Sequence, residues 1–77
     1  MTLCYIFMKI QAGFIESVIN RLNEMPEVKE AYAVTGAIDI IAKVEGEDFP
    51  TISKVILSKI HNIDGVERTS THLVAEL

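Results

Sequence analysis

Apolar and polar positions follow two different periods along this chain, and the changes of period divide it into short segments. Residues 3–10 are almost continuously apolar, which is typical of a strand covered on both faces. After the break at 11–13, apolar side chains from Phe14 to Met25 recur every three or four residues, which indicates an amphipathic helix. Pro26 is expected to end this helix.

Two further strands are predicted in the middle of the chain. Residues 28–35 alternate, so that one side of this strand is expected to carry Val28, Glu30, Tyr32 and Val34. Residues 38–45 form the next strand, whose apolar side comprises Ile38, Ile40, Ala42 and Val44. Gly36 and Ala37 lie between the strands. A glycine in the first position of a two-residue connection favours a type II′ hairpin, because it accepts a positive φ.

A second helix and a last strand complete the pattern. Asp48 is expected to cap the helix, and Pro50 is tolerated in its first turn. The buried stripe of this helix is predicted to be Phe49, Ile52, Val55, Ile56, Ile60 and Ile63. Asp64 and Gly65 end the helix, and residues 66–77 form the last strand.

The order strand-helix-strand-strand-helix-strand predicts an α+β domain of the ferredoxin-like kind, βαββαβ. Two βαβ halves with right-handed crossovers interleave into one four-stranded antiparallel sheet with both helices on one face. The first and third strands, which are the most apolar, are expected at its centre. With 77 residues, the chain is expected to be a single domain, 1–77.

Composition excludes several functions. The formal net charge is −4 and the seven Lys and Arg residues are scattered, so no basic patch for nucleic acid is expected. No apolar run approaches the ~18 residues of a membrane span. One cysteine and two histidines do not make a structural zinc site, and there is no glycine-rich phosphate loop. We therefore expect a cytoplasmic protein without a metal or cofactor.

Apolar residues on both faces of the first strand predict self-association. Two helices cover only one face of the sheet. Yet this strand carries apolar residues on both faces, Leu3, Tyr5 and Phe7 on one and Cys4, Ile6 and Met8 on the other. A large exposed apolar patch usually marks an interface, and a domain this small has a marginal core of its own. We predict a dimer through the open sheet faces. Pairing through an edge strand is the alternative.

Few residues point to chemistry. Cys4, His61 and His72 lack the neighbours that catalysis requires, and a triad of Asp39, Ser70 and His72 matches no known signature. The segment 34–39 is more informative. Backbone amides freed by Gly36 suit a carboxylate and the Asp39 carboxylate suits an ammonium group, so the pair could grip a free amino acid. The alternative is that Gly36 serves the turn and Asp39 faces solvent.

Three segments give the chain a family resemblance along essentially its whole length: Pro26-Glu27-Val28, the 34–39 hairpin, and Ile63-Asp64-Gly65-Val66 followed by Thr69-Ser70-Thr71. The chain resembles the effector domain of the Lrp/AsnC transcriptional regulators, called RAM for regulation of amino-acid metabolism. Family members normally carry an N-terminal helix-turn-helix. Because the first strand begins at the second or third residue, we expect no room for one and predict no direct DNA binding.

The resemblance implies a ferredoxin-like fold, dimers joined through their sheets in a dimeric α/β-barrel type assembly, and assembly of such dimers into an octamer or decamer, a ring of eight or ten chains. Small effectors, usually amino acids, sit between the dimers of the family. The matching positions here are Thr35, Gly36, Ala37, Ile38, Asp39, Thr69 and Thr71. By this resemblance, Gly36, Ile38 and Asp39 would hold the α-amino and carboxylate groups. A full-length Lrp/AsnC regulator is a second expected partner, by co-assembly.

Two other functions share this topology. One is a small dimeric α/β-barrel enzyme, a cofactor-free monooxygenase or isomerase, which needs a polar catalytic group inside a cavity of each subunit. The other is a regulatory domain of the ACT type, whose copies associate through sheet edges. We predict an effector-sensing and oligomerisation module rather than an enzyme, because the strands supply mainly bulky aliphatic side chains.

Overall fold

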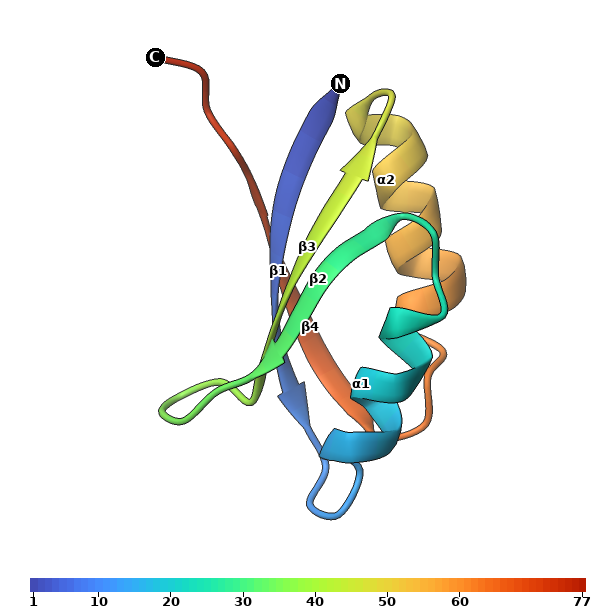
Figure 1. The fold of residues 1–77 in the computed structure, drawn as a ribbon, viewed down its shortest axis with the longest axis vertical. Helices are drawn as coiled ribbons and strands as arrows, with labels where there is room; N and C mark the ends of the chain where they lie inside the picture. The colour runs from blue at the N-terminus through green and yellow to red at the C-terminus, as the bar shows by residue number, and fades with distance from the viewer.

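The computed structural model describes residues 1–77 and has the predicted order of elements (Figure 1). The elements are β1 (Thr2–Ile10), α1 (Ile15–Asn23), β2 (Val28–Ala33), β3 (Ile40–Gly46), α2 (Phe49–Val55) with its π-helical continuation η1 (Ile56–Ile60), and β4 (Val66–Leu73). The sheet is antiparallel with the order β2-β3-β1-β4, so β1 and β3 are central as predicted. Both helices lie on the same side of the sheet, which confirms the ferredoxin-like fold.

The core lies between the sheet and the helices. Its members are all apolar: Cys4, Ile6, Met8, Ile10, Val18, Leu22, Val28, Ile40, Ala42, Val44, Ile52, Ile56, Ile60 and Ile63. Every second residue of β1 and of β3 belongs to this set, which is the period expected for strands with one covered face. Burial raises the pKa of the Cys4 thiol, as expected for a small core residue. No helix is long and apolar enough to cross a membrane.

The second helix widens into a π turn at its C-terminal end, and this turn affects where its isoleucines point. Ile52, Ile56 and Ile60 are four residues apart, and a step of four residues rotates a side chain by roughly 40° in an α-helix, because one turn takes 3.6 residues. The i→i+5 bond from the His61 N–H to the Ile56 carbonyl (2.9 Å) closes a wider turn, which rotates the next step back. All three isoleucines therefore face the sheet and are at most 5% exposed.

The predicted start of this helix is confirmed. The Asp48 carboxylate accepts a hydrogen bond from the Thr51 N–H (2.9 Å), and Pro50 lies in the first turn. Hydrogen bonds from Thr51 hold the pKa of Asp48 below its ordinary value. The predicted stripe is buried at Ile52, Ile56, Ile60 and Ile63, although Ile63 lies beyond the helical residues. The prediction is wrong at Val55, which is half-buried, and at Phe49, which is 42% exposed.

The predicted faces of β2 are wrong, because this strand contains a bulge. Val28 pairs with Val44 and Ala31 pairs with Ala42, while the register shifts by one residue in between. An extra residue in one strand reverses the alternation beyond it. Val28 and Ala31 therefore lie on the helix side, and Glu30 lies on the opposite side instead of beside Val28.

The predicted two-residue connection between 35 and 38 is also wrong. The strand β2 ends at Ala33 and β3 begins at Ile40, and a backbone bond from the Val34 N–H to the Asp39 carbonyl (2.9 Å) closes a longer loop. The Asp39 N–H donates to the Met8 carbonyl (2.9 Å) instead of pairing with β2. Gly36 has φ +116°, in the region that only glycine enters readily, as its position in a turn predicts.

The last strand is shorter than predicted. Its ladder ends at Leu73, after which the Val74 N–H donates to the Leu3 carbonyl (3.0 Å). The remaining residues leave the sheet, and the C-terminus lies well away from the helices (Figure 1).

Candidate functional site

The sheet face away from the helices carries a band of aromatic and aliphatic side chains. Strand register assigns them to one face, since directly paired residues share a face and alternate with the buried set. We call this band the open face; its members are Leu3, Tyr5, Phe7, Tyr32, Ile41 and His72. None is buried, and the tyrosines are exposed by 37% at Tyr5 and 57% at Tyr32. The open face is thus an apolar surface that no element of this chain covers.

Three polar side chains at the open face are paired with one another. The Tyr32 hydroxyl donates to the Glu30 carboxylate (2.6 Å), which also lies 3.4 Å from the Lys43 ammonium. These contacts hold the pKa of Glu30 below, and that of Tyr32 above, its ordinary value. The rings of Phe7 and His72 lie against each other with centroids 4.5 Å apart. If another surface covers these three groups, none of them loses its hydrogen-bond partner.

Asp39 anchors the β2–β3 hairpin to the end of β1. Its Oδ2 accepts a hydrogen bond from the Ile10 N–H (2.8 Å) and lies 3.4 Å from the Lys9 ammonium. The side chain is 19% exposed. The backbone bond from Ile10, followed by the contact with Lys9, holds the pKa of Asp39 below its ordinary value, so the carboxylate is charged at neutral pH. Asp39 therefore does not simply face solvent.

The other predicted hairpin residues lie beside this anchor. Thr35, Gly36 and Ala37 are exposed at the tip, and Ile38 is half-buried. The hairpin projects from the sheet on the side away from α1 and α2 (Figure 1). The tip is thus accessible to a second molecule.

The two predicted threonines lie on the other side of the sheet. Thr69 pairs with Met8 and Thr71 with Ile6, both of which face the helices, so the threonines also face that way. Lys9, which contacts Asp39, alternates with these residues and points to the open face. Within one chain the sheet therefore separates the hairpin group from the threonines, and the structure does not bring the seven predicted residues into one pocket.

Sequence reasoning missed the contacts that position Asp39. A lysine inside the apolar run 3–10 was the available signal, because a charged residue in a central strand usually has a partner. The Ile10 N–H left no signal, since any residue supplies a backbone donor. That Asp39 is the partner of Lys9 also depends on the longer hairpin loop, which the sequence did not indicate.

A ferredoxin-like domain with one uncovered apolar sheet face and an exposed polar hairpin has the architecture of a small, self-associating ligand-binding domain. Residues 3–76 match the Lrp/AsnC ligand binding domain family, and the chain belongs to that family. It is 31% identical over 75 residues to the HTH-type transcriptional regulator FL11 of Pyrococcus furiosus, a match that covers 97% of this chain and 49% of the regulator. The chain thus spans about half the length of the curated relatives it matches.

Two solved structures match over nearly their whole length. FFRP-DM1 is 37% identical with a TM-score of 0.93, and the match covers 97% of this chain and 100% of that one. The hypothetical protein PHS023 from Pyrococcus horikoshii is 36% identical with a TM-score of 0.92, covering 100% of this chain and 93% of that one. Both therefore consist of little more than this one domain.

Proposed function

We propose that this chain is an amino-acid-sensing module that assembles with copies of itself through the open face and changes its assembly when an effector binds. The observation that carries the proposal is the open face on a chain of the Lrp/AsnC ligand-binding family. A patch of this kind usually marks an interface. Dimers formed in this way would assemble further, to an octamer or decamer, and could include a full-length Lrp/AsnC regulator.

The hairpin supplies groups that suit the two charges common to all free amino acids. The tip at Gly36 offers exposed backbone N–H groups for the α-carboxylate. Asp39 offers a charged carboxylate for the α-ammonium group. Its contacts with the Ile10 N–H and the Lys9 ammonium both use Oδ2. Thr69 and Thr71 lie on the opposite face of the sheet, so those of a neighbouring copy would complete the site.

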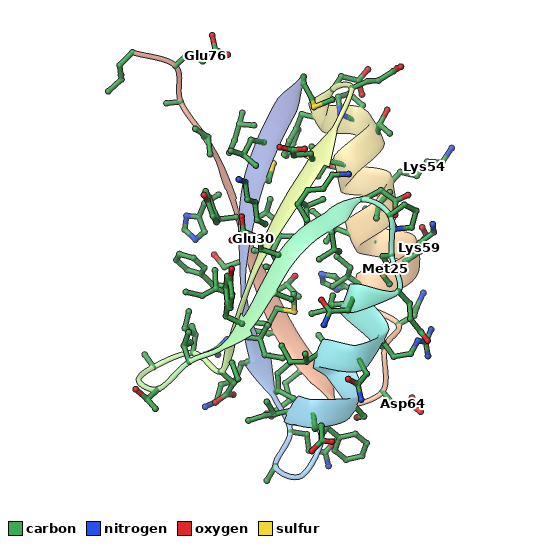
Figure 2. All side chains as sticks on the ribbon, in the orientation of Figure 1. Met25, Glu30, Lys54, Lys59, Asp64 and Glu76 are labelled. Atoms are coloured by element: carbon green, nitrogen blue, oxygen red, sulfur yellow. The ribbon has the colours of Figure 1, made fainter.

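The test combines native mass spectrometry with thermal unfolding, each with and without a panel of free amino acids. A ligand that binds the folded assembly raises its melting temperature by mass action. Asp39→Asn keeps an oxygen that can accept from the Ile10 N–H but removes the charge, so it should fold and assemble while losing most of the ligand response. Asp64→Asn is the matched control, because Asp64 lies beside α1, on the other side of the molecule from the hairpin (Figure 2).

Two results would contradict the proposal. One is a protein that remains a folded monomer at all concentrations. The other is an oligomer in which no amino acid changes either the mass distribution or the melting temperature. Turnover of an added aromatic substrate under those conditions would favour the enzyme alternative.

A further inference from the structure

A groove with a mixed polar and apolar lining lies between the second helix and β4, on the helix side of the sheet. Its lining residues come from segments far apart in the chain: Ser53, Ile56, Leu57, His61, Thr69 and Thr71. Ile56 is buried and forms the floor, whereas Leu57 is 66% exposed. Two of the lining residues are the threonines that the family resemblance connects with the effector.

The π turn shapes this groove. The bond from the His61 N–H to the Ile56 carbonyl inserts one residue into the turn, and the ring of His61 then reaches β4, where Nε2 hydrogen-bonds with the Thr69 hydroxyl. Such insertions in helices occur frequently at functional sites. The contact joins the end of the helix to the last strand, so the width of the groove is fixed from both sides.

The chemistry of the lining is selective. Hydroxyl and imidazole groups (Ser53, His61, Thr69, Thr71) donate and accept hydrogen bonds, and no Lys, Arg, Asp or Glu is among the lining residues. A charged side chain enclosed here by a neighbouring copy would lose its hydration without gaining a countercharge, and a purely apolar one would leave the hydroxyls of Ser53 and Thr71 unpaired. A side chain that ends in an amide or a hydroxyl satisfies both conditions, and its aliphatic stem would lie against Ile56 and Leu57.

We infer that this groove takes the side chain of the effector and that it selects an amino acid whose side chain is polar but uncharged, with His61 as a specificity-determining residue. The inference rests on the proposed function, because it assumes that a free amino acid is the effector. The hairpin of a neighbouring copy would hold the backbone of the amino acid, and the groove would discriminate among side chains.

The experiment measures dissociation constants by calorimetry for asparagine, glutamine, threonine, leucine, lysine and glutamate. The assembled wild type should bind an amide or hydroxyl amino acid at least tenfold more tightly than the others. Thr71→Val keeps the shape of the side chain but removes one hydroxyl. It should therefore weaken the binding of the preferred amino acid about five- to tenfold and leave the binding of leucine unchanged. His61→Phe should likewise reduce the difference in affinity between the preferred amino acid and leucine. Ser58→Ala is the control, because the Ser58 hydroxyl bonds to the Lys54 carbonyl, away from the groove.

The outcomes separate this inference from the proposed function. If the wild type binds leucine, lysine or glutamate best, or if folded Thr71→Val and His61→Phe oligomers keep the wild-type preference, the assignment of the groove is wrong and amino-acid sensing stands. If folded wild-type oligomers bind none of these amino acids, both ideas are wrong. Native mass and circular dichroism of each variant establish that the comparison is between folded assemblies.

Discussion

Among the glycines, Gly65 leaves the least room for a side chain, and its replacement by alanine tests how tightly the two halves of the domain are joined. A Cβ added at this position would lie 2.3, 2.5 and 2.7 Å from three side-chain atoms of Phe14. The backbone cannot easily move away, because the Gly65 carbonyl accepts a hydrogen bond from the Gln11 N–H (2.7 Å). The φ angle of +98° is itself unfavourable for any residue with a Cβ.

Two costs therefore add for Gly65→Ala. The left-handed backbone costs about 1–2 kcal/mol for alanine, and forcing the Phe14 ring out of its place costs about 1–3 kcal/mol as overpacking. The sum of about 2–5 kcal/mol is a large part of the 5–15 kcal/mol that stabilises a typical domain. For a chain of this size, we expect the melting temperature to fall by about 10 °C or more.

Gly36→Ala is the matched control. Gly36 also has a positive φ, +116°, but no atom lies within 4 Å of its added Cβ, so only the backbone cost of about 1–2 kcal/mol applies. Both variants are unfolded in urea and followed by circular dichroism at equal protein concentration, because dissociation also contributes to the stability of an oligomer. Equal losses of stability in the two variants would refute the argument from Phe14.

Three further outcomes are expected. Ile41→Lys places a charge on the open face and should shift native mass toward the monomer, whereas Ile41→Leu, which keeps this position apolar, should not; an unchanged native mass for folded Ile41→Lys would favour pairing through an edge strand. The folded-state pKa of Asp39 is depressed, so its contribution to stability is present above about pH 4 and is lost as the pH falls through the folded-state pKa. In urea unfolding, the difference in stability between wild type and Asp39→Asn should therefore become smaller from pH 5 to pH 3, and a constant difference would contradict the role of Asp39 as a charged anchor. Asp48→Ala removes the carboxylate that accepts the hydrogen bond from the Thr51 N–H and should lower the melting temperature by a few degrees. Asp48→Ser should recover part of that decrease, because serine can also cap the helix.

The type and order of the elements were predictable because each has a strong local period. Alternate residues of the central strand β3 are buried, and the isoleucines of the second helix were correctly placed in its buried stripe. The bulge in β2 was not predictable in this way. An edge strand is only partly buried, so its polar and apolar residues alternate acceptably in either register, and Val28 and Ala31 share a face only once their partners on β3 are known.

The candidate site was predictable as residue types but not as geometry. A glycine at a turn and an acid three residues later are visible in the sequence, and the positive φ of Gly36 follows from its position in the turn. The use of Asp39 as an anchor depends on the Ile10 N–H and Lys9, which the fold brings to it from a distant segment. The groove beside the second helix depends on a π turn, which the sequence does not indicate, and on the contact between His61 and Thr69, which requires the position of β4.

The separation of the two predicted groups by the sheet bears directly on how sensing would work. A ligand changes an assembly only if it binds one assembly state more tightly than another. An effector held by residues of one chain alone would bind the free and assembled copies equally and would shift nothing. Since Asp39 lies toward the open face and Thr69 and Thr71 face the helices, an effector that contacts both groups requires two copies. Its binding free energy then adds to the free energy of assembly, and by reciprocity a protein that assembles more readily binds the effector more tightly.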